Sequence, residues 1–352
     1  MKASIFHSRG NIRCEDVPDP VISSPDQMIV AIEATSICGS DLYLYEGPFD
    51  ALVPRGHVTG HEILGRVIDV GKDVARFRKG DRITTPFSLA CHHCAMCEIG
   101  MTGHCETTQN ACYGYGPASG NLGGSHAEAA IVHLADVNAR IVPDSIAAAD
   151  AITLSCNLPT ALLGVEAAGL KPGETIAIVG CGPTALMTLD LVLKRQPGRV
   201  VVLDRVPHRL AVAAAKGVVA INIDEADWLD RARAEAGRSG FDRVIEVVGS
   251  NESIGAALSL IRPGGTIVGL GCFAVPEIRM DPFIASLRNI NIRMEGTANV
   301  AMATEQALQM LLDGEVSPRD YFTHEYALEN IDGAWADFSA KDSGIIKALI
   351  RP

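Results

Sequence analysis

Residues 175–187 read TIAIVGCGPTALM, and this stretch decides the fold of the central part of the chain. Its apolar start has the length of a buried strand, and residues 183–195 have helical length and spacing. Between the two, Gly180 can make a tight turn, Gly182 lets the backbone approach a ligand, and Ala185 permits close packing of helix on strand. The N-terminus of such a helix presents free amides to an anion. The stretch therefore predicts a phosphate site.

The same alternation of strand and helix continues on the C-terminal side of this stretch. The predicted strands are 175–180, 199–204, 219–223, 243–249, 265–271 and 290–296, and the predicted helices are 183–195, 208–217, 228–236 and 256–260. Turn residues at 171–173 (Lys-Pro-Gly) and 263–265 (Pro-Gly-Gly) stand immediately before two of the strands. Strands that alternate with helices pair in parallel through right-handed crossovers. The pattern predicts an α/β domain with a doubly wound parallel sheet.

An acidic residue ends the second of these strands. Asp204 lies 24 residues beyond Gly180, where dinucleotide-binding sheets place the carboxylate that holds a ribose. A carboxylate accepts hydrogen bonds from a free 2′-hydroxyl but repels a 2′-phosphate. We therefore expect NAD in preference to NADP. Arg205 could turn toward a phosphate and favour NADP, and a surface Asp-Arg turn without a ligand is the remaining alternative.

The two ends of the chain have a different pattern of apolar and turn residues. Short apolar runs at 28–34, 63–70, 82–85 and 127–133 alternate with turn residues, which predicts a small barrel-like β domain. Beyond the last predicted strand the sequence has one helix, at 304–312, and a mixed tail, which we expect to return to the first domain. We find no internal repeat and no low-complexity tract.

Composition limits the class of protein. A length of 352 residues suggests two domains, and 47 % hydrophobic with 20 % charged residues is an ordinary globular balance. The net charge of −12 argues against nucleic acid or an anionic membrane as a partner. The first residues carry charges in place of an apolar signal segment, and the most apolar stretch, 175–193, is interrupted by glycines and a proline. We expect a cytoplasmic protein.

Four of the ten cysteines fall on one short segment, and in a reducing compartment they are better explained as metal ligands than as disulfides. Zinc takes four thiolates tetrahedrally, and such a closed site is structural; the expected ligands are Cys91, Cys94, Cys97 and Cys105. An iron–sulfur motif fits less well, because its last gap is shorter and a proline follows it. Three histidines between the thiols could substitute for one, but we expect solvated loop residues at His92, His93 and His104, and an unliganded thiol at Cys112.

These cysteines, together with Gly60-His61-Glu62-x2-Gly65-x5-Gly71 upstream, resemble the zinc-containing medium-chain dehydrogenase/reductase family of alcohol dehydrogenases. The resemblance covers nearly the whole chain. Two further segments, Cys38-Gly39-Ser40-Asp41 and Leu158-Pro159-Thr160, look most like the branch that contains glutathione-independent formaldehyde dehydrogenases and related alcohol or polyol enzymes.

The resemblance implies a second, catalytic zinc. Its ligands would be Cys38, His61 and Cys156, which by themselves are ordinary core residues. Three protein ligands leave a fourth position for water or substrate, and zinc there lowers the pKa of an alcohol oxygen as it does that of water. Glu62 resembles the acid beside the metal, which coordinates it transiently or orients a ligand.

A proton must leave the alcohol during oxidation. The resemblance implies Ser40, two residues after Cys38, as its first carrier. Tyr43 stands where family members often have a histidine and is a candidate catalytic residue, but its ordinary pKa near 10 does not by itself make it the replacement base near neutrality. The later proton path is therefore open. Ala161 replaces a common glycine, so the backbone beside Thr160 can differ. The implied cofactor contacts are Thr160 at the nicotinamide, Arg209 at the adenosine ribose, Gly269 and Leu270 after the fifth strand, and Thr297 on a late loop.

Together these observations predict a Rossmann NAD-binding domain at 157–296 within a GroES-like, β-rich, zinc-binding catalytic domain at 1–156 and 297–352. The expected protein carries two zinc ions and moves a hydride between an alcohol, or polyol, and NAD. Its partners would be a small alcohol, aldehyde or ketone and further copies of itself, as a dimer or tetramer. Two alternatives stay open: an aldehyde dismutase with tightly held NAD(H), and a non-catalytic NAD-binding protein of the same fold.

Overall fold

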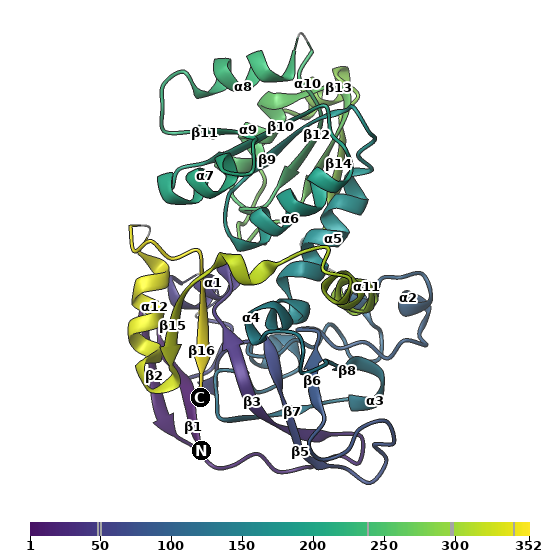
Figure 1. The fold of residues 1–352 in the computed structure, drawn as a ribbon, viewed down its shortest axis with the longest axis vertical. Helices are drawn as coiled ribbons and strands as arrows, with labels where there is room; N and C mark the ends of the chain where they lie inside the picture. The colour runs from purple at the N-terminus through teal and green to yellow at the C-terminus, as the bar shows by residue number, and fades with distance from the viewer. Residues whose placement is uncertain (48, 50, 238, 296–298, 341) are drawn as a thin grey trace. The chain divides into compact units, whose positions relative to one another are not determined.

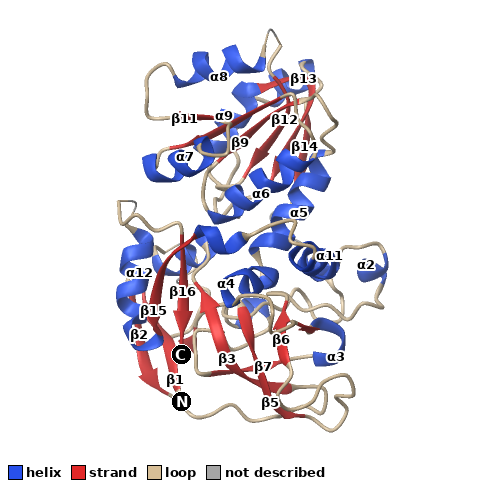
Figure 2. Ribbon diagram, viewed as in Figure 1, coloured by secondary structure: helices blue, strands red, loops and turns tan. Residues whose placement is uncertain are grey.

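A computed structural model describes the chain except for residues 48, 50, 238, 296–298 and 341. The chain divides into two compact units (Figure 1). The first joins Met1–Pro159 to Asn299–Pro352, and the second is Thr160–Ala298. Figure 2 shows most of the strands of the first unit connected by loops and short helices, whereas strands and helices alternate in the second.

The second unit is built on a six-stranded sheet in which every pairing is parallel, with the order β11-β10-β9-β12-β13-β14. Its strands are β9 (Thr175–Val179), β10 (Arg199–Asp204), β11 (Val219–Asn222), β12 (Phe241–Glu246), β13 (Ile261–Gly269) and β14 (Asn291–Met294). The strand order reverses beside β9, which lies between β10 and β12. Doubly wound sheets bind ligands at such a switch point, outside the carboxyl ends of the strands. The predicted fold class of this region is confirmed.

Helices connect these strands. They are α5 (Asn157–Ala168), α6 (Pro183–Lys194), α7 (Pro207–Ala214), α8 (Trp228–Ala236), α9 (Asn251–Leu260) and α10 (Pro282–Leu287). The start of α6 follows from its sequence, because Gly182 is the N-cap and Pro183 occupies the first helical position, where its missing N–H costs nothing. Residues 176–179 of β9 are all buried, as expected for a parallel strand covered on both faces.

One turn prediction in this unit was wrong in its position. The residues 263–265 were expected to precede a strand, but they lie inside β13. Ile261 already pairs with Phe241, and the next pair joins Thr266 to Arg243, so the residues between them form an irregularity in the strand. A proline without an N–H is tolerated at such a point, because no ladder hydrogen bond is required there.

The first unit contains a seven-stranded sheet with the path β15-β16-β3-β5-β6-β8, to which β7 adds by pairing with β3, and a three-stranded sheet β2-β1-β4. Its strands are β1 (Lys2–Ser8), β2 (Asn11–Asp16), β3 (Met28–Ser36), β4 (His57–Val58), β5 (Ile63–Val70), β6 (Arg82–Thr85), β7 (Ala129–Val132), β8 (Arg140–Ile141), β15 (Phe322–Ala327) and β16 (Lys347–Arg351). β16 pairs antiparallel with β3, so the end of the chain completes a sheet begun near its start.

Short helices fill the connections of this unit. The α-helices are α1 (Leu42–Tyr45), α2 (Ala95–Glu98), α3 (Ala135–Asn138), α4 (Ala148–Ala151), α11 (Val300–Leu312) and α12 (Ile331–Ser339). The 3-10 helices are η1 (Gly39–Asp41), η2 (Thr102–His104), η3 (Pro117–Ser119), η4 (Ile152–Ser155), η5 (Pro318–Tyr321) and η6 (Leu328–Asn330). Separate apolar clusters pack between the strands and beneath α12, where Trp335 is fully buried.

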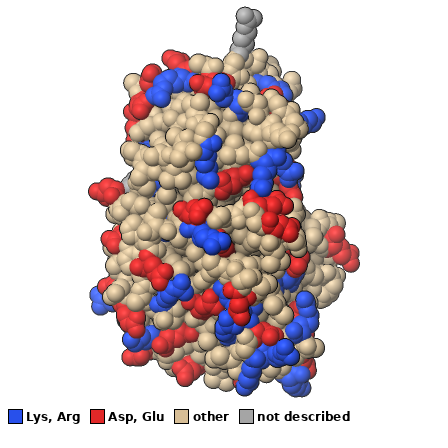
Figure 3. Space-filling view, viewed as in Figure 1, with Lys and Arg blue, Asp and Glu red and all other residues tan. Residues whose placement is uncertain are grey.

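Two properties of the whole chain bear on its partners. On the face shown in Figure 3, acidic and basic side chains are interspersed, and neither sign gathers over one element. Among the described residues, no single helix has the length and hydropathy needed to cross a bilayer; one bent pair, 148–155 with 157–168, meets that test by length and composition alone.

Two adjacent glycines give a matched test of the packing in the first unit. A Cβ added to Gly124 would lie 2.0 Å from the carbonyl oxygen of Thr59, whereas a Cβ on Gly123 meets nothing within 4 Å. We expect Gly124→Ala to lower the free energy of unfolding by roughly 1–3 kcal/mol, because backbone must shift to admit the methyl group. Gly123→Ala should change it by less than about 0.5 kcal/mol. Urea unfolding of the two variants checks this, and equal effects would contradict the packing described.

Candidate functional site

Three predicted ligands converge in the first unit. Cys38 follows β3 and caps η1, His61 lies between β4 and β5, and Cys156 ends η4. The sulfur atoms of Cys38 and Cys156 are 4.0 Å apart. The donor atoms of all three residues and a carboxylate oxygen of Glu62 lie within 4.8 Å of one another. All four side chains are buried, so the structure brings together a compact group of donors away from solvent.

Buried hydroxyls tie the three segments to one another. Ser155, the neighbour of Cys156, accepts a hydrogen bond from the backbone N–H of Ile63 (3.1 Å) and donates to the carbonyl of Thr85 (2.5 Å). Thr35 on β3 donates to the carbonyl of Glu62 (2.8 Å). Hydrogen bonds between fully buried groups are costly to leave unmade, so each one holds its segment in register. The donors are therefore positioned by the sheet and not by a mobile loop.

Asp41 orients the imidazole. One carboxylate oxygen lies 2.9 Å from Nδ1 of His61, and the other accepts the backbone N–H of Cys38 at 2.9 Å. A carboxylate on Nδ1 keeps the proton there and leaves Nε2 as the donor atom for a metal. Burial lowers the pKa of His61, but Asp41 and Cys38 outweigh it and raise that pKa well above its ordinary value, so a metal that binds Nε2 must displace a proton. Contact with Cys156, followed by His61, lowers the pKa of the Cys38 thiol and favours the thiolate.

Glu62 forms a buried ion pair with a lysine from the end of the chain. Nζ of Lys347, on β16, lies 3.0 Å from Oε1 of Glu62, and both side chains are fully buried. Burial raises the pKa of Glu62 to about 7, and the lysine opposes that rise. Oε2 is buried with no hydrogen-bond partner among the described residues. One oxygen of the carboxylate is thus held by Lys347 while the other is available to a ligand.

The predicted proton carrier lies beside this group, with an unpredicted partner. The hydroxyl of Tyr115 donates to Oγ of Ser40 at 2.9 Å. The same hydroxyl lies 3.3 Å from Nδ1 of His61 and 3.4 Å from Oδ1 of Asp41. The ring of Tyr43, in α1, packs against Phe49 with centroids 5.4 Å apart. The tyrosine hydroxyl on Ser40 is therefore that of Tyr115.

The group formed by Cys38, His61 and Cys156 fits a zinc ion. Zinc–sulfur bonds of about 2.3 Å in a tetrahedral site place two sulfurs about 3.8 Å apart, close to the separation of Cys38 and Cys156. The donor set of two sulfurs and one imidazole is one that zinc prefers. A carboxylate oxygen of Glu62 is a further donor within reach. Two sulfurs and one nitrogen leave the fourth position to an exchangeable oxygen or to this carboxylate.

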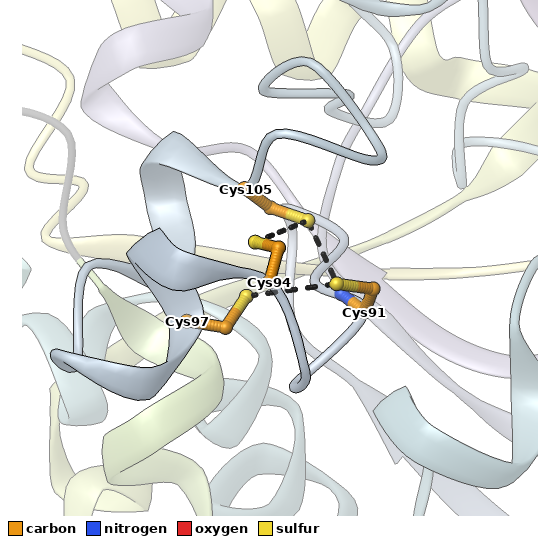
Figure 4. Close-up of side chains that lie close together, drawn as sticks. All are labelled: Cys91, Cys94, Cys97 and Cys105. Atoms are coloured by element: carbon orange, nitrogen blue, oxygen red, sulfur yellow. Dashed lines mark hydrogen bonds between the residues drawn. The ribbon is translucent and has the colours of Figure 1, made fainter.

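The second group consists of cysteines alone. Around α2 and η2, the sulfurs of four cysteines point toward one another (Figure 4): Cys91, Cys94, Cys97 and Cys105. Two of the separations are 4.0 Å (Cys91 to Cys97) and 3.9 Å (Cys94 to Cys105), and all four atoms lie within 4.8 Å. Backbone N–H groups also approach two of the sulfurs, at 3.3 and 3.4 Å, as expected around thiolates. The arrangement fits a closed tetrahedral zinc site.

The other candidates on this segment stand apart from the four thiols. The group of possible ligands among the described residues contains none of the three intervening histidines. Nδ1 of His93 hydrogen-bonds to the carbonyl of Cys91 (2.8 Å), and Cys112 donates its S–H to the carbonyl of Asn110 (3.4 Å). The segment packs on α11, where Asn299 accepts the N–H of Gly103 at 2.9 Å.

The second unit holds the predicted nucleotide residues at the switch point. Gly180 has φ +108°, and a Cβ there would lie 2.8 Å from Val248, in the loop that follows β12. Asp204 ends β10, and its Oδ2 accepts the N–H of Cys181, within the glycine turn, at 2.6 Å. Its Oδ1 accepts two backbone N–H groups of the next residues. Arg205 pairs with Asp224 at 3.4 Å. The carboxylate and the glycine turn therefore stand together at the carboxyl edge of the sheet.

The remaining predicted contacts are distributed around this edge. A Cβ on Gly182 would lie 4.0 Å from the guanidinium of Arg209, so this arginine stands close to the glycine turn. Leu270 is buried after β13 and packs near Gly164 of α5. Thr160, also on α5, has a buried hydroxyl with no hydrogen-bond partner among the described residues. The other three positions are Ala185, buried in α6, Gly269 at the end of β13, and Thr297, which lies outside the described residues.

Comparison with known proteins decides the family. The family model "Alcohol dehydrogenase GroES-like domain" matches residues 24–143, and "Zinc-binding dehydrogenase" matches residues 183–313. The alcohol dehydrogenase TADH from Thermus sp. ATN1 is 31 % identical, with a TM-score of 0.91 over 100 % of this chain and 99 % of that one. The chain belongs to the zinc-containing medium-chain alcohol dehydrogenase family. The predicted GroES-like and Rossmann folds are thereby confirmed.

Two curated relatives indicate the range of chemistry around this alcohol dehydrogenase. A sorbitol dehydrogenase of Bacillus subtilis is 28 % identical over 100 % of this chain and 97 % of its own length. A glutathione-independent formaldehyde dehydrogenase of Pseudomonas aeruginosa is 33 % identical over 70 % of this chain and 64 % of its own length. Both are similar to this chain, and the branch of the family stays a prediction.

Three residues of the site were not predicted from the sequence. Asp41 stood inside the quoted Cys-Gly-Ser-Asp segment, and its place three residues after Cys38 was the available signal. Tyr115 lies between two glycines, a weak sign of a fixed loop. Lys347 carries no local signal, because a lysine near a chain end is ordinarily exposed.

The buried pair of this alcohol dehydrogenase gives a stability prediction. Lys347→Met leaves the fully buried Glu62 without its counterion, so we expect the free energy of unfolding to fall by roughly 3–5 kcal/mol. The matched control is Lys2→Met, which removes an exposed lysine paired with Glu329 at 2.6 Å and should have no measurable effect. Chemical denaturation of both variants checks the difference. An unchanged Lys347→Met protein would show that the ion pair does not form.

Proposed function

We propose that the protein oxidises an alcohol or polyol, and reduces the matching aldehyde or ketone, by hydride exchange with NAD at a zinc site formed by Cys38, His61 and Cys156. The observation that carries this proposal is the convergence of two sulfurs and one imidazole in a buried group beside the Ser40 hydroxyl. Family membership supplies the reaction class. The geometry supports the assignment of individual residues to it.

The residues around the metal have separable tasks. When bound there, zinc supplies a Lewis acid that favours the deprotonated form of an alcohol. Asp41 holds the Nδ1 proton of His61 and so fixes the imidazole as a nitrogen donor. Ser40 presents a hydroxyl that accepts the alcohol proton at Oγ as it passes its own proton on toward solvent, so that the serine stays neutral. Lys347 balances the charge of Glu62, which keeps an anionic site stable out of water.

The four clustered cysteines are proposed to hold the second, structural zinc. Four sulfurs close the coordination sphere and leave no position for a substrate. This zinc therefore stabilises the segment between Cys91 and Cys105, which packs on α11 through Gly103 and Asn299.

NAD is the proposed cofactor, with NADP less favoured. Oδ1 of Asp204 already accepts two backbone N–H groups and Oδ2 accepts one, which leaves Oδ2 with a second acceptor position for a ribose hydroxyl. A 2′-phosphate would meet this negative charge. The arginine that could favour a phosphate, Arg205, is paired with Asp224. The roles of Thr160, Arg209, Gly269, Leu270 and Thr297 are part of the same proposal, as is the division into a catalytic domain (1–156 and 297–352) and a nucleotide domain (157–296).

A cytoplasmic location is part of the proposal. All ten cysteines are outside disulfides, which fits the reducing cytoplasm.

A homo-oligomer is also proposed. Large apolar side chains are exposed on α10 and β14, and β14 is an edge strand. Exposed apolar patches of this kind mark protein interfaces, which supports a homo-oligomer. The described residues include Phe283, Ile284, Leu287 and Met294 among these exposed side chains.

A substrate screen tests the function. The zinc-loaded protein is given a panel of primary and secondary alcohols, polyols and aldehydes with NAD and NADP in parallel, and NAD(P)H absorbance is followed. We expect NAD-dependent oxidation of at least one alcohol class, with a lower rate on NADP. Turnover of formaldehyde without added cofactor would indicate a dismutase. No activity on the whole panel with two zinc ions bound would indicate a non-catalytic protein.

Two cysteine variants serve as controls for the two metal sites in the same assay. Cys38→Ser should abolish turnover while the unfolding midpoint changes little, because it removes one ligand of the open site. Cys94→Ser should chiefly lower the unfolding midpoint, since structural zinc supplies ~10–16 kcal/mol of apparent binding energy to folding. The reverse pattern would show that the two sites have been exchanged.

A further inference from the structure

Tyr115 lies on a fixed loop at the catalytic group. The two residues that flank it, Gly114 and Gly116, have φ values of +77° and +72°. A Cβ on Gly114 would lie 2.4 Å from the carbonyl oxygen of Gly60, the residue before His61. The N–H of Gly116 donates to Nε2 of His57 at 3.2 Å. At Gly114 this loop is therefore packed backbone to backbone against the segment that carries His61, and a side chain at that position would push it away.

The ring and the hydroxyl of Tyr115 contact different members of the group. The ring stacks on the imidazole of His61, with centroids 5.4 Å apart and an interplanar angle of 29°. The hydroxyl donates to Oγ of Ser40 at 2.9 Å, and Ser40 is the shortest of its three polar contacts. Oδ1 of Asp41, a more distant contact, is already engaged by Nδ1 of His61. The geometry thus directs the phenol proton toward Ser40.

A hydroxyl has one proton to donate and two lone pairs to accept with. When Tyr115 occupies one lone pair of Ser40, the remaining lone pair and the serine proton are restricted to the other directions. The serine hydroxyl is then pre-oriented, and the rotation of its O–H group does not have to be restricted during the reaction. Deleting the phenol oxygen would leave Ser40 in place with its hydroxyl free to rotate.

We infer that Tyr115 is a positioning residue of this dehydrogenase, which holds the Ser40 hydroxyl in the orientation that receives the alcohol proton while the serine passes its own proton on toward solvent. The inference rests on the proposed function. It assigns to Tyr115 a task that neither sequence spacing nor the position of Tyr43 indicated. The tyrosine acts through Ser40, so its contribution should disappear when the serine hydroxyl is absent.

The test is a double-mutant cycle on Tyr115→Phe and Ser40→Ala. Tyr115→Phe keeps the ring on His61 and removes only the hydroxyl. We expect kcat for alcohol oxidation to fall about tenfold, the size of one lost hydrogen bond, with the KM for NAD unchanged. In the Ser40→Ala background, measured by single turnover at high enzyme concentration, the same change should alter the rate by less than about twofold. Zinc content and the unfolding midpoint should match those of the parent proteins.

Tyr326→Phe is the matched control, because this tyrosine lies on β15 of the same unit and its exposed hydroxyl donates to Asp337, in α12, at 2.8 Å. It should leave kcat unchanged. A Tyr115→Phe enzyme as fast as wild type, or an equal loss in both backgrounds, overturns the inference while the proposed function stands. A fall in kcat accompanied by loss of zinc also overturns it, since the tyrosine would then support the metal site and not the serine. Inactive wild-type protein would overturn both proposals.

Discussion

The structure depends on one constraint: two sulfurs and an imidazole from separate segments must be held at coordination distance in a buried place. Cys38 and Cys156 are 118 positions apart in the chain, yet their sulfurs lie 4.0 Å from each other. Such a cluster is unfavourable without a metal, because buried thiolates and unpaired donors lose their hydration. The framework that enforces it is the antiparallel sheet of the first unit, reinforced by the buried hydroxyls of Thr35 and Ser155.

Charge balance explains why the end of the chain belongs to this site. With both cysteines as thiolates, Glu62 ionised and the buried carboxylate of Asp41 included, the group carries four negative charges, and a zinc ion supplies two positive ones. Lys347, fully buried on β16, supplies a third positive charge and leaves one net negative charge. A small net charge favours the burial of so many ionised side chains. The pairing of β16 with β3 therefore matters for the chemistry as well as for the sheet.

The features that could be predicted from the sequence are those that depend on local sequence patterns. The helix at 228–236 and the strands at 63–70, 82–85 and 199–204 have the predicted bounds, because apolar periodicity and turn residues determine them locally. The fourfold cysteine spacing likewise indicated a cluster that the structure shows. Asp41, Tyr115 and Lys347 could not be derived in this way, since their roles arise from contacts between distant segments. The turn predicted at Pro-Gly-Gly was placed before its strand and not within it for a related reason, because the pairing of β13 with β12 continues across these residues.

Metal coordination tests the central claim most directly. Zinc K-edge X-ray absorption of the purified protein, with zinc content measured on the same sample, reports the average shell around both ions. The account predicts two zinc ions per chain and an average of three sulfur atoms and one nitrogen or oxygen atom per zinc, from one site with four sulfurs and one with two. A single zinc per chain, or an average of four sulfur atoms, would contradict it.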